Sequence, residues 1–341
     1  MAYIFFVFLQ FNFLQMKKIG VFGVGHLGQI HCKCIKESDE AELCGIYDVN
    51  ICHAKEVADQ LGVPFYEHAE QLLSHCDIAD VVCTTTHHYD MTKLAILHNK
   101  PVFIEKPVTA TVEQAEELIQ LSKEHNIPIQ VGHVERFNPA YIAAKSKIKQ
   151  PMFIEGHRLA LFNPRGNDVS VILDLMIHDI DIVLKIVKSP IVDIQASGVA
   201  IVTDSFDIAN VRLTFANGCV ANLTASRISM KNMRKIRLFQ ENAYISMDFL
   251  EKKTEMIHIE SITEEINDPF AMIIDLGENK GKKRIIIDNP TITPNNAIRS
   301  ELESFIHSID NQTIPEVSLH DGYLALKTAA EIIKKMNHNI K

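Results

Sequence analysis

The sequence predicts an α/β domain with a doubly wound parallel sheet, followed by an α+β domain with a large, mostly antiparallel open sheet. Three observations support this prediction. The chain has 341 residues, more than a single hydrophobic core usually supports. From Lys17 to about residue 135, short apolar runs alternate with helical patterns, which is typical of a parallel sheet covered by helices. From about residue 190 to residue 288, strand patterns follow one another directly, which is typical of an antiparallel sheet.

The first domain is expected to span residues 16–135. Apolar runs predict its buried strands at residues 17–25, 41–48, 78–85, 101–106 and 128–134. The segments between them predict helices at residues 26–38, 51–62, 89–100 and 111–126. Thr111 is placed to cap the last of these helices.

The second domain is expected to span residues 136–341. A strand is predicted at residues 151–162, followed by a loop rich in Asn, Pro and Gly and by a helix within residues 168–188. Asn217-Gly218 is a strong hairpin signal between two later strands. Helices at residues 295–310 and 319–337 close the chain and are expected to be able to pack back on the first domain.

Composition and charge argue against several functional classes. The hydrophobic content of 47% and the charged content of 23% are those of an ordinary globular protein. A net charge of −9 argues against a nucleic-acid partner, because phosphate backbones require a basic face. The seven cysteines are odd in number, and Cys32 and Cys34 lie two apart on a predicted helix without a second pair to complete a zinc site. We therefore expect no metal, and reduced cysteines in a cytoplasmic setting.

The first fifteen residues, "MAYIFFVFLQFNFLQ", are strongly apolar. They are too short to span a bilayer and lack the basic start and small-residue cleavage site of a signal peptide. Met16 follows them and directly precedes the first predicted strand. Our interpretation is that translation starts at Met16, that residues 1–15 are a non-native extension, and that no membrane partner is involved; the alternative is that these residues anchor the chain to a membrane or a partner.

The stretch "GVGHLG" places Gly23, Gly25 and Gly28 in G-x-G-x-x-G spacing between a strand and a helix. This spacing is typical of a Rossmann dinucleotide site, in which backbone N–H groups, here including those of His26 and Leu27, face the pyrophosphate. Asp48 ends the next strand, twenty residues after Gly28. A carboxylate there can accept both ribose hydroxyls, which favours NAD over NADP. The alternatives are a glycine-rich turn in another doubly wound protein and a strand-end turn at Asp48.

The stretch "IEKP" places Glu105, Lys106 and Pro107 at the end of an apolar strand. Ligands of open α/β sheets bind outside the carboxyl ends of the strands, so Lys106 is expected to face the nicotinamide side of the crevice. Pro107 biases Lys106 towards an extended backbone. The alternative is a solvated pair of charges.

The stretch "DLMIHDID" lies in an otherwise apolar helix, and Asp174, His178, Asp181 and Lys185 follow at spacings of four, three and four. They are expected on one face, with Asp179 off it. They could be the hydrated face of a helix; a metal site lacks further ligands. As a catalytic group, Asp174 would hold the imidazole ring and His178 would touch the substrate as a base, with Lys106 polarising the hydroxyl or relaying its proton. Asp181 would then be a helix-face or interdomain contact.

With these three motifs in order, the chain from Met16 onward resembles the glucose–fructose oxidoreductase/inositol dehydrogenase (Gfo/Idh/MocA) family. The resemblance implies that Lys106, Asp174 and His178 line the substrate pocket beside the nicotinamide. It implies a cofactor-side position for Thr85, His88 and Glu105, in a loop that has Thr84 where relatives often have proline. It also implies a homodimer or homotetramer assembled through the open sheet.

The segments "VGHVERFNPA", "RLALFNPRGNDVSVILDLMIHDIDI" and "VANLTASRISMKNMRKIRLF" resemble the branch that oxidises UDP-N-acetylglucosamine-type sugar nucleotides at the 3-hydroxyl. The resemblance implies a 3-keto product destined for amination, and Asn138 as a partner of a sugar hydroxyl. Diphosphate contacts could come from several arginines, namely Arg136, Arg158, Arg165, Arg227 and Arg234. Of these we select Arg158 and Arg165, because they flank the predicted catalytic helix.

The sequence hypothesis is therefore an NAD-dependent oxidation of a sugar hydroxyl, most specifically the 3-hydroxyl of a UDP-N-acetylhexosamine. A dehydrogenase of a free polyol or sugar such as inositol is an alternative within the same enzyme class. A non-catalytic, NAD-sensing regulatory protein on the same fold is the alternative from another class.

Overall fold

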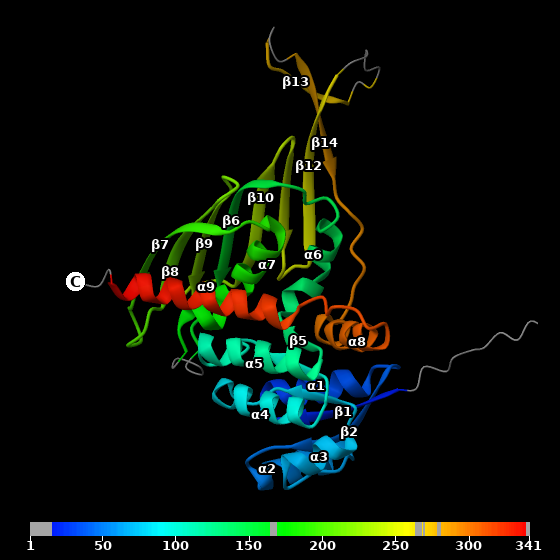
Figure 1. Ribbon diagram of the computed structural model, residues 1–341. Helices are drawn as coiled ribbons and strands as arrows, with labels where there is room; N and C mark the ends of the chain where they lie inside the picture. The colour runs from blue at the N-terminus through cyan, green and yellow to red at the C-terminus, as the bar shows by residue number, and fades with distance from the viewer. Residues whose placement is uncertain (1–15, 164–168, 263–267, 269, 278–280, 339–341) are drawn as a thin grey trace, which may run out of the picture.

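The computed structural model describes residues 16–163, 169–262, 268, 270–277 and 281–338. It contains two β-sheets, of which the first lies below the second in Figure 1. Residues 1–15, and with them the predicted extension, lie outside the described residues, as does Arg165. Among the helices that the structure describes, none is both long and apolar enough to cross a membrane.

The first sheet has five parallel strands in the order β2-β1-β3-β4-β5, as the sequence predicts. The strands are β1 (Lys17–Phe22), β2 (Ala41–Tyr47), β3 (Ile78–Val81), β4 (Val102–Glu105) and β5 (Ile129–Gly132). The helices on its two faces are α1 (His26–Lys36), α2 (Ile51–Leu61), α3 (Ala69–His75), α4 (Thr85–Leu97) and α5 (Val112–His125). All residues of β3, β4 and β5 are buried, because helices cover both faces of the sheet.

Two details of this domain differ from the sequence prediction. Helix α3 was not predicted, because its seven residues are too few to show a clear helical period. Helix α4 begins at Thr85, four residues before the predicted start. The cap at Thr111 is confirmed. Its side chain accepts a hydrogen bond from the backbone N–H of Gln114, and the side-chain oxygen of Gln114 accepts one from the backbone N–H of Thr111.

The second sheet has nine strands in the order β13-β14-β12-β11-β10-β6-β9-β8-β7. Its described strands are antiparallel to their neighbours except for the parallel pair β6 and β9, which confirms the predicted mostly antiparallel sheet. The strands are β6 (Pro151–Leu159), β7 (Ile191–Val199), β8 (Ile208–Phe215), β9 (Val220–Ser226), β10 (Met233–Gln240), β11 (Ala243–Asp248), β12 (Lys253–Ser261), β13 (Met272–Asp275) and β14 (Lys282–Asp288). The predicted hairpin at Asn217-Gly218 joins β8 to β9, and Gly218 has a φ of +86°.

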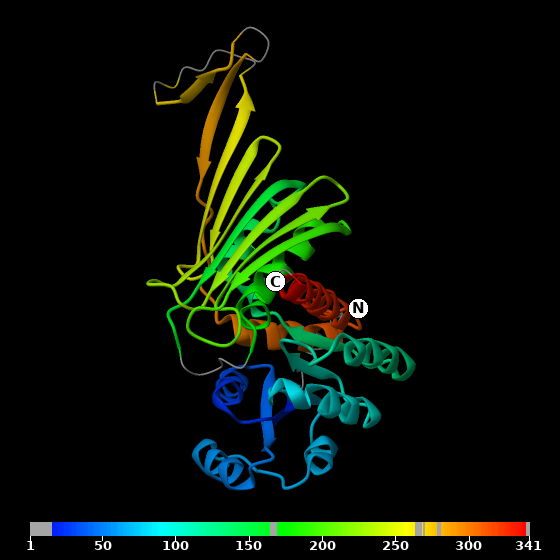
Figure 2. The same cartoon turned by 90° about the vertical axis from the view of Figure 1, so that its left-hand side faces the viewer.

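Helices cover one face of this sheet, and no described helix of the chain covers the other face (Figure 2). The covering elements are η1 (Val134–Phe137), α6 (Pro139–Ala144), the π-helical turn η2 (Ile172–Met176), α7 (Ile177–Val187) and α9 (Leu319–His338). Helix α8 (Ala297–Asp310) instead packs on the first domain, where Leu302, Phe305 and Ile306 share a hydrophobic cluster with Ile19 and Phe103. The carboxyl end of β4 meets η2, because Lys106, directly after β4, bonds Asp174 of η2.

Candidate active site

The glycine loop between β1 and α1 has the geometry of a phosphate cradle. Gly23 has a φ of +103°, and a Cβ on Gly28 would lie 2.0 Å from the carbonyl oxygen of Gly23, so neither position accepts a larger residue. A Cβ on Gly25 would meet no atom within 4 Å. Gly25 begins α1 without any side-chain cap, so the first N–H groups of the helix face an open space that fits a pyrophosphate.

His26 and Leu27 lie exposed in the first turn of α1, beside this space. Asp48 follows β2, and its carboxylate accepts the N–H groups of Val24 and Asn50, each at 2.9 Å. These bonds hold a negative charge beside the glycine loop, at the position where a dinucleotide presents its ribose hydroxyls. The glycine loop, the first turn of α1 and Asp48 therefore lie together, and this arrangement fits a dinucleotide.

Lys106 follows β4 and reaches across to the second domain. Its side chain is 18% exposed, and its Nζ donates to the carbonyl oxygen of Asp174 at 2.8 Å. The carboxylate of Asp174 lies 4.0 Å from the same nitrogen. Burial lowers the pKa of the Lys106 ammonium, although the Asp174 and Glu105 carboxylates oppose this shift. The peptide bond between Lys106 and Pro107 is cis.

The helix predicted to carry Asp174 and His178 contains a π-helical turn, η2, over Ile172–Met176. A π turn contains an extra residue, so it rotates Asp174 relative to the residues of α7. The Asp174 carboxylate lies near Lys106. The structure shows no hydrogen bond from the described residues to Nδ1 of His178, so the role of Asp174 in holding this ring stays a prediction.

His178 is partly buried, with its Nδ1 atom shielded from solvent. Burial, and then the positive charges of Lys106 and Arg158, lower the pKa of its imidazole well below the usual 6.5. The ring is therefore neutral at pH 7 and can accept a proton. His133, directly after β5, is also buried, and burial lowers its pKa as well. Sequence reasoning missed His133, although its place after a buried parallel strand was a usable signal.

Arg158 was predicted to contact a substrate diphosphate, and the structure gives it other partners. Its side chain is 3% exposed. It donates to both oxygens of Asp179, at 2.8 to 3.2 Å, and to Glu135 at 2.9 Å. The guanidinium is neutralised by two carboxylates of its own chain, so it ties β6 to α7 and η1 instead of facing a ligand. The prediction that Asp179 faces away from the Asp174–His178 stripe agrees with this pairing.

Asn138 was predicted to contact a sugar hydroxyl, but its amide is fully used inside the protein. Its nitrogen donates to Glu135 Oε2 and to the Phe249 carbonyl oxygen, each at 2.9 Å, while its oxygen caps α6 by accepting the Ala140 N–H. It therefore ties η1 and α6 to the loop after β11. Glu135, which holds both Asn138 and Arg158, is a second residue that sequence reasoning missed.

Glu105 was predicted to lie at the cofactor, but its carboxylate turns into the interior. It lies 3.3 Å from Nε2 of His31, whose Nδ1 bonds Asp80 at 3.0 Å. The ligand atoms of His31, Glu105 and Glu301 lie within 4.8 Å of one another, a spacing that could hold a metal ion. Burial and the neighbouring Glu105 charge raise the pKa of Glu301 well above its usual range, so this carboxyl keeps its proton and is a poor cation ligand.

His88 and Thr85 lie on the first two turns of α4. The ring of His88 is buried and bridges two loops, with Nδ1 2.9 Å from the Pro107 carbonyl oxygen and Nε2 3.0 Å from that of Cys83. His88 thus joins the loop after β3 to the loop that carries Lys106. Thr85 is partly exposed at the helix start, on the cofactor side of the sheet.

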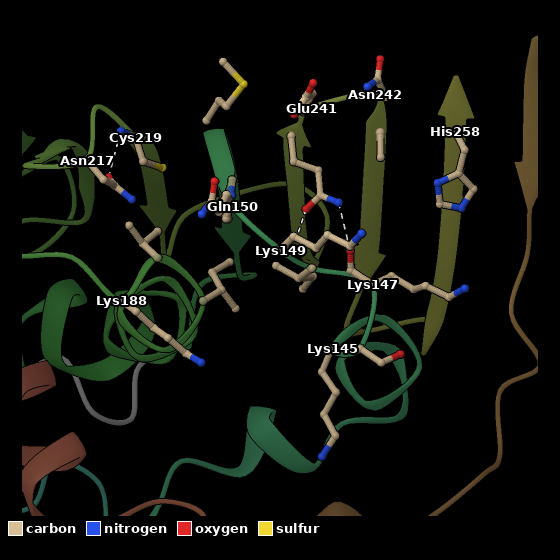
Figure 3. A pocket seen from close by; sticks show the side chains of 18 of the residues that line it. Lys145, Lys147, Lys149, Gln150, Lys188, Asn217, Cys219, Glu241, Asn242 and His258 are labelled. Carbon is tan, nitrogen blue, oxygen red and sulfur yellow. Dashed lines mark hydrogen bonds between the residues drawn. The ribbon is translucent and has the colours of Figure 1, made fainter. Parts of the chain in front are cut away.

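A groove of about 1790 Å³ lies elsewhere (Figure 3). It opens at the Pro151 end of β6 and at the C-terminal end of α7, whereas Arg158 lies near the other end of β6 and His178 lies in the first turn of α7. Its lining includes Lys145, Lys147, Lys149 and Lys188. None of the lining residues is a predicted site residue, so this groove is separate from the candidate active site.

Comparison with known proteins agrees with this geometry. The family profile described as "Oxidoreductase family, NAD-binding Rossmann fold" matches residues 17–133, and the GFO/IDH/MocA C-terminal domain matches residues 150–246. The UDP-N-acetylglucosamine 3-dehydrogenase of Acidithiobacillus ferrooxidans is 37% identical over 242 residues, which are 71% of this chain and 77% of that protein. The myo-inositol 2-dehydrogenase of Thermotoga maritima is 24% identical over 91% of this chain and 93% of its own length.

Solved structures show the same relationship. The structure of the Acidithiobacillus enzyme superposes with a TM-score of 0.85 and 30% identity, covering 96% of this chain and 100% of that one. A scyllo-inositol dehydrogenase from Lactobacillus casei, solved with NAD(H) and scyllo-inositol, has a TM-score of 0.75 and 21% identity over 95% of this chain and 98% of that one. The second likeness shows the shared fold.

Proposed function

The chain belongs to the GFO/IDH/MocA oxidoreductase family and is a dehydrogenase of CH–OH groups, and on this premise we propose that it oxidises the 3-hydroxyl of a UDP-N-acetylhexosamine with NAD. The name of the 37%-identical relative supports the sugar nucleotide and the position oxidised. The cofactor, when bound, accepts a hydride from the carbon that carries the hydroxyl.

The open space at Gly25, the free N–H groups of α1 and the carboxylate of Asp48 support NAD as the cofactor. A 2′-phosphate would lie beside the fixed negative charge of Asp48, which is the reason to prefer NAD over NADP. The test is to compare the two dinucleotides with the wild type and with Asp48→Ser. The wild type is expected to bind NAD more tightly than NADP, and Asp48→Ser is expected to reduce this difference in affinity.

Lys106 and His178 have the chemistry that alcohol oxidation requires. Neutral His178 accepts the hydroxyl proton, and the Lys106 ammonium donates a hydrogen bond to the substrate oxygen as negative charge develops there. Asp174 holds Lys106 in place through its carbonyl oxygen and its nearby carboxylate. Acid–base assistance of this kind contributes on the order of 10²–10⁴ in rate.

The observation that carries the proposal is the His178 imidazole, whose Nδ1 has no hydrogen-bond partner among the described residues and whose pKa is lowered by burial and then by the charge of the neighbouring Lys106. A general base needs a free nitrogen and must be unprotonated at the working pH. A structural histidine would normally spend both ring nitrogens on protein partners, as His88 does.

The test follows NADH formation at its absorbance band with UDP-N-acetylglucosamine, for the wild type and for Lys106→Met and His178→Asn. Both variants are expected to lose at least about 100-fold in kcat while still binding NAD. Lys145→Met and His125→Asn are matched controls, because these exposed residues lie in the remote groove and at the end of α5. Turnover with inositol but with no UDP-sugar would instead select a free polyol as the substrate. NAD binding without turnover of any sugar or polyol would contradict the catalytic roles.

A further inference from the structure

Arg227 is a buried cation without a counter-charge in the part of the chain that the structure describes. It directly follows β9 and is 5% exposed. Its Nη2 donates to the carbonyl oxygen of Val169, while Nε and Nη1 have no hydrogen-bond partner among the described residues. A guanidinium stays charged at every working pH, and an unpaired charge is costly to bury. Such a group is stable when an anion completes it.

The sheet register places Arg227 on the face of the catalytic helix. Arg158 of β6 lies opposite Ala225 of β9, and side chains two residues apart on a strand share a face. Arg227 therefore points to the same side as Arg158, whose bonds to Asp179 of α7 identify that side. Helix turn η2, which carries Asp174, packs against β9.

Arg234 lies on the other side of β6, on the same face. It is directly opposite Arg158 in the antiparallel pair of β10 and β6, and directly opposite residues share a face. Its side chain is 52% exposed and lies 3.9 Å from Glu135. Its charge contributes to lowering the pKa values of Lys106 and His178, as expected for a group on the rim of their pocket.

We propose that Arg227 and Arg234 bind the phosphate groups of the substrate and thereby select sugar nucleotides over free sugars. Strands β9 and β10 are separated by β6, so the two arginine backbones lie roughly 10 Å apart across the sheet. Guanidinium groups reaching inward from both sides can grip a diphosphate, for which their paired N–H groups are well suited. This inference rests on the proposed function and names the part of the chain that recognises its substrate class.

The first experiment measures the binding of UDP, which lacks the sugar, to the NAD-loaded protein by calorimetry. Arg227→Met is expected to weaken UDP binding about 10- to 100-fold, as for the loss of charge-assisted hydrogen bonds, and Arg234→Met about 10-fold. Arg227→Lys should recover only part of the loss, because lysine lacks the planar pair of donors. Arg212→Met is the matched control, because Arg212 is exposed and bonds Asn222 on the open face.

The thermal midpoint separates ligand binding from a structural role. Removing an unpaired buried charge should leave the Tm of Arg227→Met equal to or above that of the wild type. A fall in Tm with unchanged UDP affinity would overturn the proposal, since Arg227 would then support the fold alone. UDP-sugar turnover with wild-type KM in both methionine variants would overturn it while leaving the proposed function intact. A wild type that binds no UDP but oxidises inositol would overturn both.

A sugar carboxylate could also supply the anion. N-acetylglucosamine 1-phosphate and glucuronic acid therefore serve as further probes in the same titration. Competition with UDP by the phosphate ester, and not by the carboxylate, is expected. The opposite order would overturn the assignment of these arginines to phosphate.

Discussion

The buried ion pair between Arg136 and Asp181 makes a quantitative prediction about stability. Both side chains are 1% exposed, and Nε of Arg136 donates to Asp181 Oδ2 at 2.7 Å while Nη2 binds Oδ1. The pair joins η1 to α7, and Nη2 also lies 3.4 Å from Asp321 of α9. Breaking a buried pair by removing one partner typically costs about 3–5 kcal/mol, because the other charge stays buried and unpaired.

Removing Asp181 and removing Arg136 should lower the free energy of unfolding by different amounts. Asp181→Asn leaves Arg136 with Asp321 and the Glu316 carbonyl oxygen, so we expect a loss near the lower end, about 3 kcal/mol. Arg136→Met leaves the Asp181 carboxylate without a cation in bonding range among the described residues, so we expect about 5 kcal/mol. The double variant Arg136→Met/Asp181→Leu, with apolar groups of similar size, should recover to within about 2 kcal/mol of the wild type.

Urea unfolding followed by far-UV circular dichroism measures these differences, since the chain has no tryptophan to report by fluorescence. The slopes with urea should be unchanged, so that shifts in midpoint report stability alone. The surface pair Arg237–Glu155, with side chains 38% and 34% exposed, is the control and should cost less than about 1 kcal/mol. A loss below 1 kcal/mol for both single variants at Arg136 and Asp181 would refute the reasoning, as would a double variant less stable than either single one.

Three further predictions concern the cofactor loop, the base and the interior. Gly25→Ala should weaken NAD binding at least about 10-fold and leave the Tm unchanged. Gly28→Ala should weaken NAD binding and also lower the Tm, because the new Cβ would meet the Gly23 carbonyl oxygen. Calorimetry measures NAD binding and thermal melts measure the Tm, and equal changes in Tm for the two variants would count against this geometry. The acid limb of kcat/KM should lie below pH 6.5, because burial and the neighbouring charges lower the pKa of His178, and a limb at 6.5 or above would contradict its role as base. Because the folded-state pKa of Glu301 is raised, the unfolded chain releases this proton first and wild-type stability falls as pH rises above about 4.5. Relative to the wild type, Glu301→Gln should therefore gain stability as the pH rises above about 4.5, and a difference independent of pH would show that Glu301 is ionised in the fold.

The fold was predictable because its signals are local. Alternating apolar runs, the turn at Asn217-Gly218 and the cap at Thr111 each act within a few residues, and the structure contains all of them. The positions of Lys106 and of the glycine loop followed from one topological rule, that ligands bind at the carboxyl ends of parallel strands. The seven-residue helix α3 fell below the length at which a period can be recognised.

The partners of the charged residues were not predictable in the same way. Arg158 was chosen because it lies near the catalytic helix in sequence, yet it is neutralised by Asp179 and Glu135, which come from two other elements. Asn138 likewise serves as a helix cap and a tie to Phe249, 111 residues away. Whether an arginine is free for a ligand depends on which carboxylates the tertiary fold brings to it, and a single sequence does not contain those pairings. Arg227 is the opposite case: the structure, and not the sequence, shows that its Nε and Nη1 have no hydrogen-bond partner among the described residues.

The motif "DLMIHDID" owes its chemistry to the different directions that its polar side chains take. The carboxylate of Asp174, in the π turn, lies 4.0 Å from the Lys106 nitrogen, while Asp179 and Asp181 on α7 point inward to Arg158 and Arg136. These ion pairs anchor the helix on two sides and use both of its buried carboxylates.

Burial is the largest cause that lowers the pKa of His178, and the positive charges of Lys106 and Arg158 come next. A straight α-helix would have put Asp174 one turn from His178, which would raise the pKa of the ring and favour its protonated form. In the structure, burial and then the charges of Lys106 and Arg158 lower the pKa of His178 and keep it neutral at pH 7, which is the state that a base for alcohol oxidation requires.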